Sequence, residues 1–443
     1  MSERPPWSAD AQRPILWSAG RAVSVGELAR DVASLARALP PEPFLINLCE
    51  ERYAFLVAFC AAIARGKTNL LPPSRAPESV AEVASAHAAS YRCDDAVVHA
   101  ALVAAAEPAA MEKFAAEVPA RHVAVIGFTS GSTGQPKGHT KRWGGLLRST
   151  ALNASRIREQ LRSRHGESAP WILATVPSQH MYGLETSVLL PLVANMGVHA
   201  GRPMFAADVA AALAELPQPR VLISTPVHLH MLAASEQRFP EIALVVSATA
   251  PMDAGLAVTI ERALQTTVLE MFGSTETCVI ASRRTAREAG WRLYPEVRLT
   301  PEGEGTRVDA PWFDVPNVLQ DVVTLLPDGT FTLRGRNADL IEVAGKRASL
   351  ADLTRRLLAV PGVRDAAVFL PEASAAGEVR RVAALVVAPG SSAEAVRAGL
   401  RDAIDPVFLP RPLVLVDELP RNEVGKLPRE SLLAALRNAR KRS

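Results

Sequence analysis

Short apolar runs alternate with alanine-rich helical stretches over residues 20–300. The runs have the length and composition of buried strands, and each precedes a helical or loop segment; they cover 44–48, 123–128, 171–176, 221–224 and 244–247. This alternation is typical of a layered α/β domain with largely parallel sheets. We therefore expect residues 1–336 to form a large α/β N-terminal domain.

The pattern changes after residue 312. Asp328-Gly329 separates two apolar runs and predicts a hairpin turn. Beyond Arg336 the pattern predicts helices over 350–358 and 393–404 and strands over 363–370 and 382–387. That order indicates a compact α+β unit, so we expect residues 337–443 to form a small C-terminal domain.

Composition narrows the class of protein. The 443-residue chain has a formal net charge of +3, which is too small to favour a nucleic-acid partner. Four cysteines without C-x-x-C spacing exclude a disulfide framework or zinc ribbon and fit a reducing cytoplasm. Residues 1–10 lack a signal peptide, and the longest apolar run, Tyr53–Ala64, is too short to span a bilayer. We expect a soluble, cytoplasmic protein, with the basic run 437–442 a solvated tail or a contact for an acidic carrier protein.

One segment, Thr129–Gly138, has the chemistry of a phosphate-binding loop. Glycines expose backbone amides, and hydroxyls and a lysine add donors, as a polyphosphate requires. The Walker pattern fails, because Lys137 precedes the glycine and His139 stands where Ser or Thr belongs. The candidate nucleotide-binding residues of this segment are Thr129, Ser130, Gly131, Ser132, Thr133, Gly134 and Lys137.

Three further polar clusters follow along the chain. Glu276 comes after a predicted strand and a glycine turn, where it can hold Mg²⁺ on a phosphate or be an ordinary loop glutamate. Asp321 and Arg336 flank the predicted hairpin, where they can bind ribose hydroxyls or form a surface salt bridge. Lys426 lies on a proline-bounded loop, where a lone lysine is usually solvated.

Together, in this order, the clusters resemble the adenylate-forming superfamily of acyl-CoA synthetases, peptide-synthetase adenylation domains and luciferases. Thr129–Gly138 resembles its phosphate loop, and Phe272–Glu276 its Tyr-Gly-x-Thr-Glu motif with phenylalanine for tyrosine. Residues 335–339 resemble its Gly-Arg-x-Asp-Asp hinge, with Ala338 in place of the first aspartate. Pro420–Lys426 resembles its Pro-Arg-x-x-x-Gly-Lys motif.

The resemblance implies roles for these residues and implies ATP and Mg²⁺ as cosubstrate and cofactor. Lys426 would act in adenylation, Glu276 would hold the metal, and Asp339 would be the hinge of a mobile C-terminal domain. The other residues that it implies in nucleotide binding are Phe272, Gly273, Thr275, Asp321 and Arg336. The large domain is shorter than is usual in the superfamily.

The sequence indicates the carboxylic acid substrate less specifically than it indicates the nucleotide. Pro177–Gly183 resembles the superfamily's Pro-x-x-His-x-x-Gly acyl-pocket segment, with His180 flanking the carboxylate or acting as a core histidine. The expected pocket residues are His180, Met181, Tyr182, Gly183, Ala248, Thr249 and Ala250. The length and Trp143-Gly144-Gly145 look most like the short AMP-ligases of aryl polyene and xanthomonadin-type pathways.

That resemblance implies a 3- or 4-hydroxybenzoate- or cinnamate-like aryl acid, delivered to an acyl carrier protein or to CoA. A medium- or long-chain fatty acid is the alternative substrate. Two rival classes stay open: a non-catalytic acyl- or nucleotide-binding module, and an adenylating enzyme with an amine or oxygen acceptor.

Overall fold

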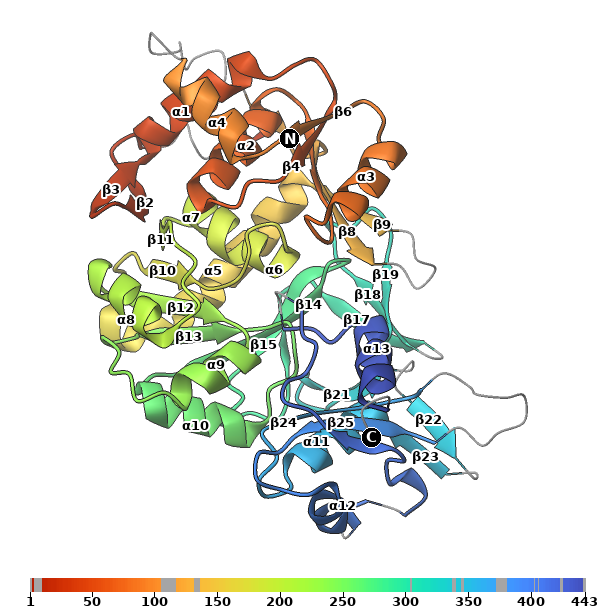
Figure 1. Ribbon diagram of the computed structural model, residues 1–443. Helices are drawn as coiled ribbons and strands as arrows, with labels where there is room; N and C mark the ends of the chain where they lie inside the picture. The colour runs from red at the N-terminus through yellow and green to blue at the C-terminus, as the bar shows by residue number, and fades with distance from the viewer. Residues whose placement is uncertain are drawn as a thin grey trace. The chain divides into compact units, whose positions relative to one another are not determined.

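The computed structural model describes residues 2–3, 10–104, 117–130, 136–302, 305–336, 340–343, 346–371, 381–401, 403–404, 406–422 and 425–440. The chain divides into two compact units (Figure 1). The first unit consists of Met1–Val297 with Ala310–Val315, and the second of Arg298–Asp309 with Pro316–Ser443.

A nine-stranded sheet organises most of the first unit. In spatial order its strands are β16 (Arg292–Leu293), β15 (Cys278–Arg283), β14 (Val268–Ser274), β13 (Leu244–Ser247), β12 (Arg220–Ser224), β10 (Trp171–Ala174), β11 (Gly197–His199), β2 (Pro14–Ser18) and β3 (Arg21–Ser24). The strands from β14 to β2 run parallel, and antiparallel strands close both edges. The runs 171–176, 221–224 and 244–247, predicted as strands, therefore lie in the parallel centre of this sheet, where strands are buried on both faces.

Helices α8 (Ala206–Glu215), α9 (Pro226–Ala233) and α10 (Ala254–Leu264) pack on this sheet. Their apolar side chains form one core with alternate strand residues, among them Leu173, Leu222 and Val245. A long helix, α5 (Trp143–His165), contacts strands of both large sheets of the unit. Burial of the central strands leaves the strand ends as the places where polar chemistry can lie.

The second large sheet has five strands. Their order is β6 (Ser90–Cys93), β4 (Phe44–Asn47), β5 (Thr68–Leu71), β8 (Val123–Ser130) and β9 (Pro136–Arg142). Of these only β9 runs antiparallel to its neighbour. The helices around this sheet are α1 (Val25–Ala38), α2 (Arg52–Ala64), α3 (Pro77–Ala86) and α4 (Asp95–Val103).

Short elements complete the first unit. They are β1 (Ser2–Glu3), β7 (Val118–Pro119), α6 (Met181–Leu184), the π-helix η3 (Glu185–Leu189) and α7 (Leu190–Val193). None of the helices in the described ranges is long and apolar enough to cross a bilayer. The predicted core helix, α2, begins one residue before the apolar run at Tyr53.

The second unit is built from small sheets. Its strands are β17 (Arg298–Glu302), β18 (Gly305–Asp309), β19 (Asn317–Leu319), β20 (Asp321–Leu325), β21 (Phe331–Arg336), β22 (Leu340–Val343), β23 (Lys346–Ser349), β24 (Asp365–Phe369), β25 (Ala383–Val387) and β26 (Leu413–Leu415). Its helices are α11 (Leu350–Leu358), α12 (Ala393–Arg401), the 3₁₀ turn η5 (Pro406–Phe408) and α13 (Arg429–Arg440).

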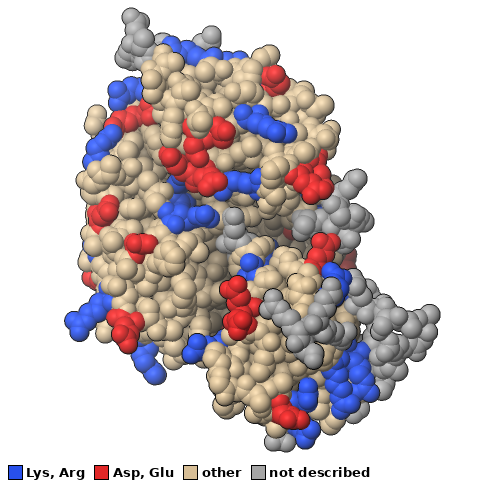
Figure 2. Space-filling model, in the orientation of Figure 1, with Lys and Arg blue, Asp and Glu red and all other residues tan. Residues whose placement is uncertain are grey.

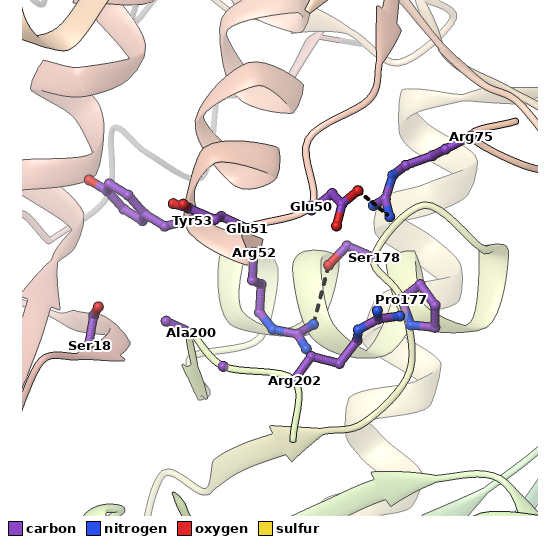
Figure 3. A pocket seen from close by; sticks show the side chains of 11 residues that line it. Ser18, Glu50, Glu51, Arg52, Tyr53, Arg75, Pro177, Ser178, Ala200 and Arg202 are labelled. Carbon is purple, nitrogen blue, oxygen red and sulfur yellow. Dashed lines mark hydrogen bonds and ion pairs between the residues drawn. The ribbon is translucent and has the colours of Figure 1, made fainter. Parts of the chain in front are cut away.

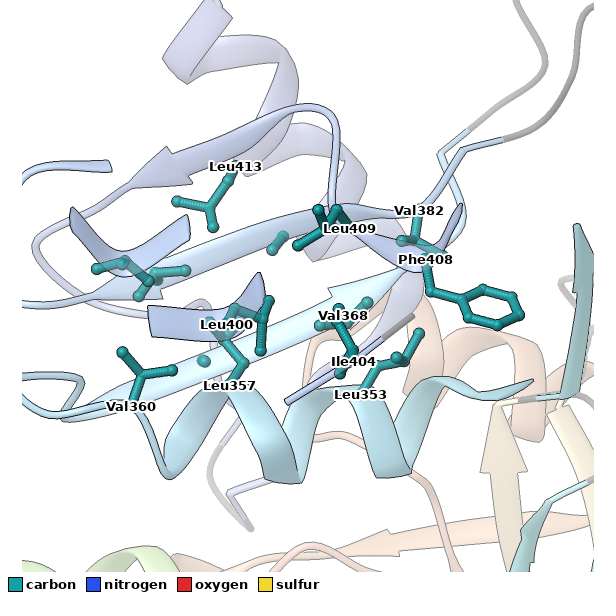
Figure 4. Close-up of a cluster of buried hydrophobic side chains, with 14 of the residues drawn as sticks. Leu353, Leu357, Val360, Val368, Val382, Leu400, Ile404, Phe408, Leu409 and Leu413 are labelled. Atoms are coloured by element: carbon teal, nitrogen blue, oxygen red, sulfur yellow. The ribbon is translucent and has the colours of Figure 1, made fainter. Parts of the chain in front are cut away.

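An apolar core holds α11 and α12 against the sheet β24-β25-β26 (Figure 4). Leu353 and Leu357 of α11 meet Leu400 of α12 in this core because residues four apart share a helix face. The predicted Asp328-Gly329 turn joins β20 to β21, and Gly329 has the positive φ of 80° that such a turn requires of glycine.

The division between the units does not fall at the expected position of residue 336. Strands β17, β18 and β19 belong with the hairpin β20–β21, and the Thr306 hydroxyl donates to the Asp321 carbonyl at 2.7 Å. The second unit therefore takes in residues 298–309 and everything from 316 onward. Pairing between segments distant in sequence decides this boundary, and the local pattern at Gly335-Arg336 does not reveal it.

A buried ion pair on β14 and β15 generates a stability prediction. The Glu270 side chain is 2% exposed and accepts hydrogen bonds from Arg283 Nε at 2.9 Å, Thr285 Oγ1 at 2.5 Å and the Met252 amide at 3.1 Å. Arg283→Ala would leave a buried carboxylate without its cationic partner, so we expect the free energy of unfolding to fall by about 3–5 kcal/mol. All six tryptophans lie in the first unit, so tryptophan fluorescence during urea denaturation reports on it.

The matched control is Arg292→Ala. Arg292 pairs with Glu159 at the surface, where the side chains are 63% and 46% exposed, so its loss should cost at most about 1 kcal/mol. Equal losses of unfolding free energy in the two variants would contradict the larger contribution to stability that we assign to the buried pair.

Candidate functional site

Segments predicted to carry the site follow neighbouring strands of the nine-stranded sheet. Residues 177–183 follow β10, residues 248–250 follow β13, and Gly273–Thr277 lies at the end of β14. Strands β10, β12, β13 and β14 are adjacent and parallel, so their carboxyl ends meet at one edge. Ligands of open α/β sheets bind at this edge.

Glu276 lies in the tight turn between β14 and β15. Gly273 is required there, because a Cβ at this position would lie 2.1 Å from the carbonyl oxygen of Cys278. Thr277 fixes the turn: its hydroxyl accepts from the Ser274 amide at 3.2 Å and donates to the Cys278 carbonyl at 2.8 Å. The strand therefore continues through Ser274, and the predicted loop is a short hairpin.

The predicted phosphate loop lies at the tip of the hairpin β8–β9. Thr129 and Ser130 belong to β8, and Thr129 is the Cα partner of Lys137 in β9. Lys137 is exposed. Gly131, Ser132, Thr133 and Gly134 lie outside the described residues.

The phosphate-loop hairpin and the Glu276 turn are in contact. His139 Nε2 lies 3.0 Å from the Thr129 hydroxyl and 3.5 Å from Glu276 Oε1. Two residues along the same face of β9, the Lys141 ammonium donates to the Glu276 carbonyl. The structure thus brings together two predicted sites that are more than 130 residues apart in sequence.

Gly127 of β8 lies close to two of the neighbouring segments. A Cβ there would lie 3.3 Å from Met181 Cε and 3.3 Å from Thr275 Cγ2. Three predicted segments, the hairpin, the Glu276 turn and the His180 segment, therefore converge on one glycine.

The Glu276 carboxyl is held in the form that binds cations. Burial alone raises its pKa, but hydrogen bonding from Ser274 and from backbone, with His139 and Lys141 nearby, outweighs burial and leaves the pKa below its ordinary value. In the described part of the chain no three His, Cys, Asp or Glu side chains form a metal cluster. A lone, ionised carboxylate suits Mg²⁺, which takes one or two protein ligands and completes its shell with phosphate oxygens and water.

The His180 segment is packed tightly beneath this region. His180 is half-buried at the start of α6, and Tyr182 is buried with its hydroxyl donating to the Val246 carbonyl at 3.0 Å. Gly183 admits no side chain, because a Cβ would lie 1.9 Å from the Pro177 carbonyl oxygen. Tyr182 and Gly183 therefore fix the segment's path.

The loop after β13 is strained at one residue. Thr249 has a φ of 80°, which is unfavourable for a β-branched side chain, between a buried Ala248 and a half-buried Ala250. Strain of this kind concentrates at functional sites. On β14, the ring of Phe272 packs on Trp291 with centroids 5.4 Å apart.

Sequence reasoning missed a buried carboxylate, Glu185, in the π-helix η3. It accepts from Ser149 Oγ at 2.6 Å, from Asn153 Nδ2 at 3.1 Å and from the Val279 amide at 3.1 Å. Burial raises the pKa of Glu185. Glu185 therefore ties α5 to the strand that leaves the Glu276 turn. A glutamate near the start of the largely apolar stretch 184–194 was the available signal.

A separate pocket of about 460 Å³ lies in the first unit (Figure 3). Arg52, 3% exposed, is one of its lining residues and donates to Ser178 Oγ at 3.3 Å, to the Ala174 carbonyl at 2.8 Å and to the His199 carbonyl at 3.1 Å. Burial, and then Arg202, lower the pKa of Arg52. Arg52 thereby anchors the chain that leads from β10 to His180.

The rim of this pocket carries both signs of charge. Arg75 and Arg202 line it together with Glu50 and Glu51. Acidic and basic side chains also stand next to one another on the surface of the first unit in Figure 2. None of the predicted nucleotide-binding residues lines the pocket.

In the second unit, Asp321 and Arg336 are Cα partners across the hairpin β20–β21. The hairpin therefore places their backbones opposite each other. Asp339, the predicted hinge, lies outside the described residues.

The Lys426 loop is firmly held. Asn422 Oδ1 accepts from the Lys426 amide at 2.8 Å, and the Asn422 amide donates to the Lys426 carbonyl at 2.8 Å. Arg421 forms a two-pronged pair with Asp365, with contacts of 2.7 and 3.0 Å, and donates to the Gly425 carbonyl at 2.8 Å. Gly425 has a φ of 76°. The motif's arginine and glycine therefore shape the turn that carries the exposed lysine.

Curated relatives share much of the chain. The 4-coumarate–CoA ligase of Cereibacter sphaeroides is 30% identical over 308 residues, covering 68% of this chain and 69% of the relative. The mitochondrial malonate–CoA ligase of Mus musculus is 25% identical, covering 72% and 66%. The 4-chlorobenzoate–CoA ligase of a Pseudomonas species is 26% identical, covering 69% and 64%.

Solved structures share the fold. The o-succinylbenzoate CoA synthetase of Bacillus subtilis with its acyl-adenylate intermediate matches with a TM-score of 0.81 at 19% identity, covering 98% of each chain. The same enzyme with ATP and a magnesium ion matches with a TM-score of 0.80 at 20% identity, covering 96% of this chain and 99% of that one.

The predicted fold, a large α/β and a small C-terminal domain, is confirmed. The predicted class, an acid–thiol ligase that uses ATP and Mg²⁺, is likewise confirmed. The AMP-binding enzyme family matches residues 44–303, and its C-terminal domain matches residues 355–426. The chain therefore belongs to the AMP-binding enzyme family.

Proposed function

We propose that this enzyme joins an aryl carboxylic acid to a thiol in two steps, through an acyl-adenylate. The observation that carries the proposal is the contact between the phosphate-loop hairpin and the Glu276 turn, made through His139 and Lys141. This contact sets the hairpin that we propose binds phosphate beside a carboxyl group whose pKa is lowered, in a member of the AMP-binding enzyme family.

In the first step a carboxylate oxygen of the acid attacks the α-phosphorus of ATP, and pyrophosphate leaves. Both reactants are anions, so cationic groups must lower the repulsion between them. Lys426 would bridge the carboxylate and the α-phosphate, Thr275 would contact the α-phosphate, and Thr129 with its loop would cradle the β- and γ-phosphates. Bound Mg²⁺ would supply further charge neutralisation at the phosphates.

Other residues would position the nucleotide. The Asp321 carboxylate would accept hydrogen bonds from ribose hydroxyls, with Arg336 beside it, and the Phe272 ring would stack on adenine. The Trp291 ring contacts the Phe272 ring, with centroids 5.4 Å apart, and would help to orient it. Positioning of this kind lowers the barrier because it removes the entropic cost of aligning the reactants.

In the second step the acceptor sulfur attacks the acyl carbonyl, and AMP leaves with the electrons of the broken acyl–oxygen bond. We propose that the small domain rotates about Asp339 between the steps, which withdraws Lys426 and opens a path for the thiol. A movement of this kind gates the reaction. The acceptor would be a phosphopantetheine thiol, of an acyl carrier protein or of CoA. The relatives named here are CoA ligases.

An aryl acid is favoured by two findings. Two relatives act, by name, on the ring acids 4-coumarate and 4-chlorobenzoate. The side chains at 248–250 are short, which would suit a flat ring in the expected acyl pocket. A hydroxybenzoate- or cinnamate-like acid, as in aryl polyene and xanthomonadin-type ligases, fits both. The second candidate is a fatty or other small acid, since the same small residues admit an acyl chain and one relative is named for malonate.

We also propose a cytoplasmic location. All four cysteines are buried and unpaired, as in proteins that work where thiols stay reduced. Burial also raises the pKa of Cys60 and Cys278, which keeps both thiols protonated and inert.

The substrate prediction is tested by ATP–pyrophosphate exchange over a panel of benzoates, cinnamates and fatty acids. We expect aryl acids to give the fastest exchange, because a rigid ring loses less conformational freedom on binding than a flexible acyl chain. Octanoate outperforming every ring acid would overturn the aryl assignment. Absence of exchange with every acid would favour a non-catalytic binding module.

The domain-alternation prediction is tested with Lys426→Ala. We expect pyrophosphate exchange to fall by a factor of about 100 or more, because a charge that acts in the transition state is lost. Thioester formation from preformed acyl-adenylate, measured with both CoA and a holo-carrier protein, should change by less than about threefold, since Lys426 is withdrawn in that step.

The control is Arg429→Ala, which removes an exposed cation three residues further on and should leave both half-reactions unchanged. Equal loss of both half-reactions in Lys426→Ala would contradict alternation. Faster transfer to an amine than to either thiol would contradict the acceptor class.

A further inference from the structure

His139 occupies the position after the loop's glycine, and neither the phosphate loop nor the proposed mechanism gives it a role. It is buried in β9, 9% exposed, with its Nε2 facing two groups. These groups are the Thr129 hydroxyl at 3.0 Å and the Glu276 carboxylate at 3.5 Å. One ring nitrogen thus bridges the start of the predicted phosphate loop and the carboxylate to which the superfamily resemblance assigns Mg²⁺.

The surroundings select one tautomer of the ring. A bare Nε2 would turn its lone pair toward a carboxylate oxygen 3.5 Å away, whereas Nε2–H is attracted to it. The proton therefore resides on Nε2, and the ring donates to Thr129.

This tautomer fixes the direction of the Thr129 hydroxyl. A hydroxyl that accepts from the ring uses a lone pair for that bond and keeps its own proton to donate elsewhere. Thr129 stands two residues before Gly131, at the end of β8, where the predicted phosphate loop begins. A hydroxyl donor at this place matches the need of a phosphate oxygen.

We propose that His139 is a positioning residue that aims the Thr129 hydroxyl at the nucleotide's phosphates and keeps it in register with the Glu276 carboxylate. Lys141 assists from the next position on the same face of β9, by holding the Glu276 carbonyl. The inference rests on the proposed function, because it assumes that the loop binds ATP.

The test compares His139→Gln with His139→Asn. The glutamine amide reaches the place of Nε2 and can donate to Thr129, whereas the shorter asparagine amide reaches only the place of Nδ1. ATP affinity is measured by calorimetry in EDTA, so that the readout does not depend on metal or on turnover. We expect His139→Asn to bind ATP about tenfold more weakly and His139→Gln within about twofold of the wild type, as for one hydrogen bond to a charged group.

A double-mutant cycle with Thr129→Val separates aiming from general packing. If His139 acts through Thr129, then His139→Asn should weaken ATP binding no further once the hydroxyl is gone. In exchange assays the KM for ATP should rise in His139→Asn, while the KM for the acid should stay unchanged. Thermal unfolding of each variant identifies any loss of fold. If His139→Asn unfolds, the double variant His139→Gln,Thr129→Val is compared with Thr129→Val instead. The double variant must then show no added loss of ATP affinity.

Two results would overturn the proposal: wild-type ATP affinity in His139→Asn, or additive losses in the cycle. These results are distinct from failure of the proposed function. A wild-type protein that binds ATP but exchanges pyrophosphate with no acid would refute the ligase activity and leave the calorimetric comparison valid.

Discussion

The parallel register of β10, β12, β13 and β14 is the constraint on which the candidate site depends. Because these strands are neighbours that point the same way, the segments leaving them are delivered to one edge of the sheet. The His180 segment, the strained Thr249 loop and the Glu276 turn all leave from that edge. Each is then fixed by contacts of its own: Arg52 and Gly183 for the first, Gly273 and Thr277 for the last.

The five-stranded sheet supplies the other half of the candidate site. Its last strand, β9, reverses direction and brings a row of polar residues against the Glu276 turn. Pro136–Arg142 has little hydrophobicity of its own, so it is a strand because β8 pairs with it along its whole length. Two buried polar side chains at alternate positions, 139 and 141, then bind one sheet to the other. Polar contacts between layers are directional, so they specify how the layers meet as well as that they meet.

Much of this could be predicted from the sequence. The central strands and the helices of the second unit follow from apolar periodicity, and the five motifs are separate stretches that can be recognised one at a time. What escaped prediction depends on contacts between distant segments. The partnership of His139 with Glu276 spans more than 130 residues, Glu185 meets Val279 across 94 residues, and the early boundary of the second unit depends on strand pairing. A polar residue in a strand gives no local sign of what lies opposite.

The two-pronged bond between Arg421 and Asp365 has a mechanical consequence. It links the Lys426 turn to the first residue of β24, and the hydrogen bonds between Asn422 and Lys426 hold the turn together. Lys426 is therefore attached through Arg421 to the sheet of the second unit. A rotation of that unit would therefore move the lysine with it. A substitution at Arg421 would weaken this attachment while leaving the charge of Lys426 unchanged.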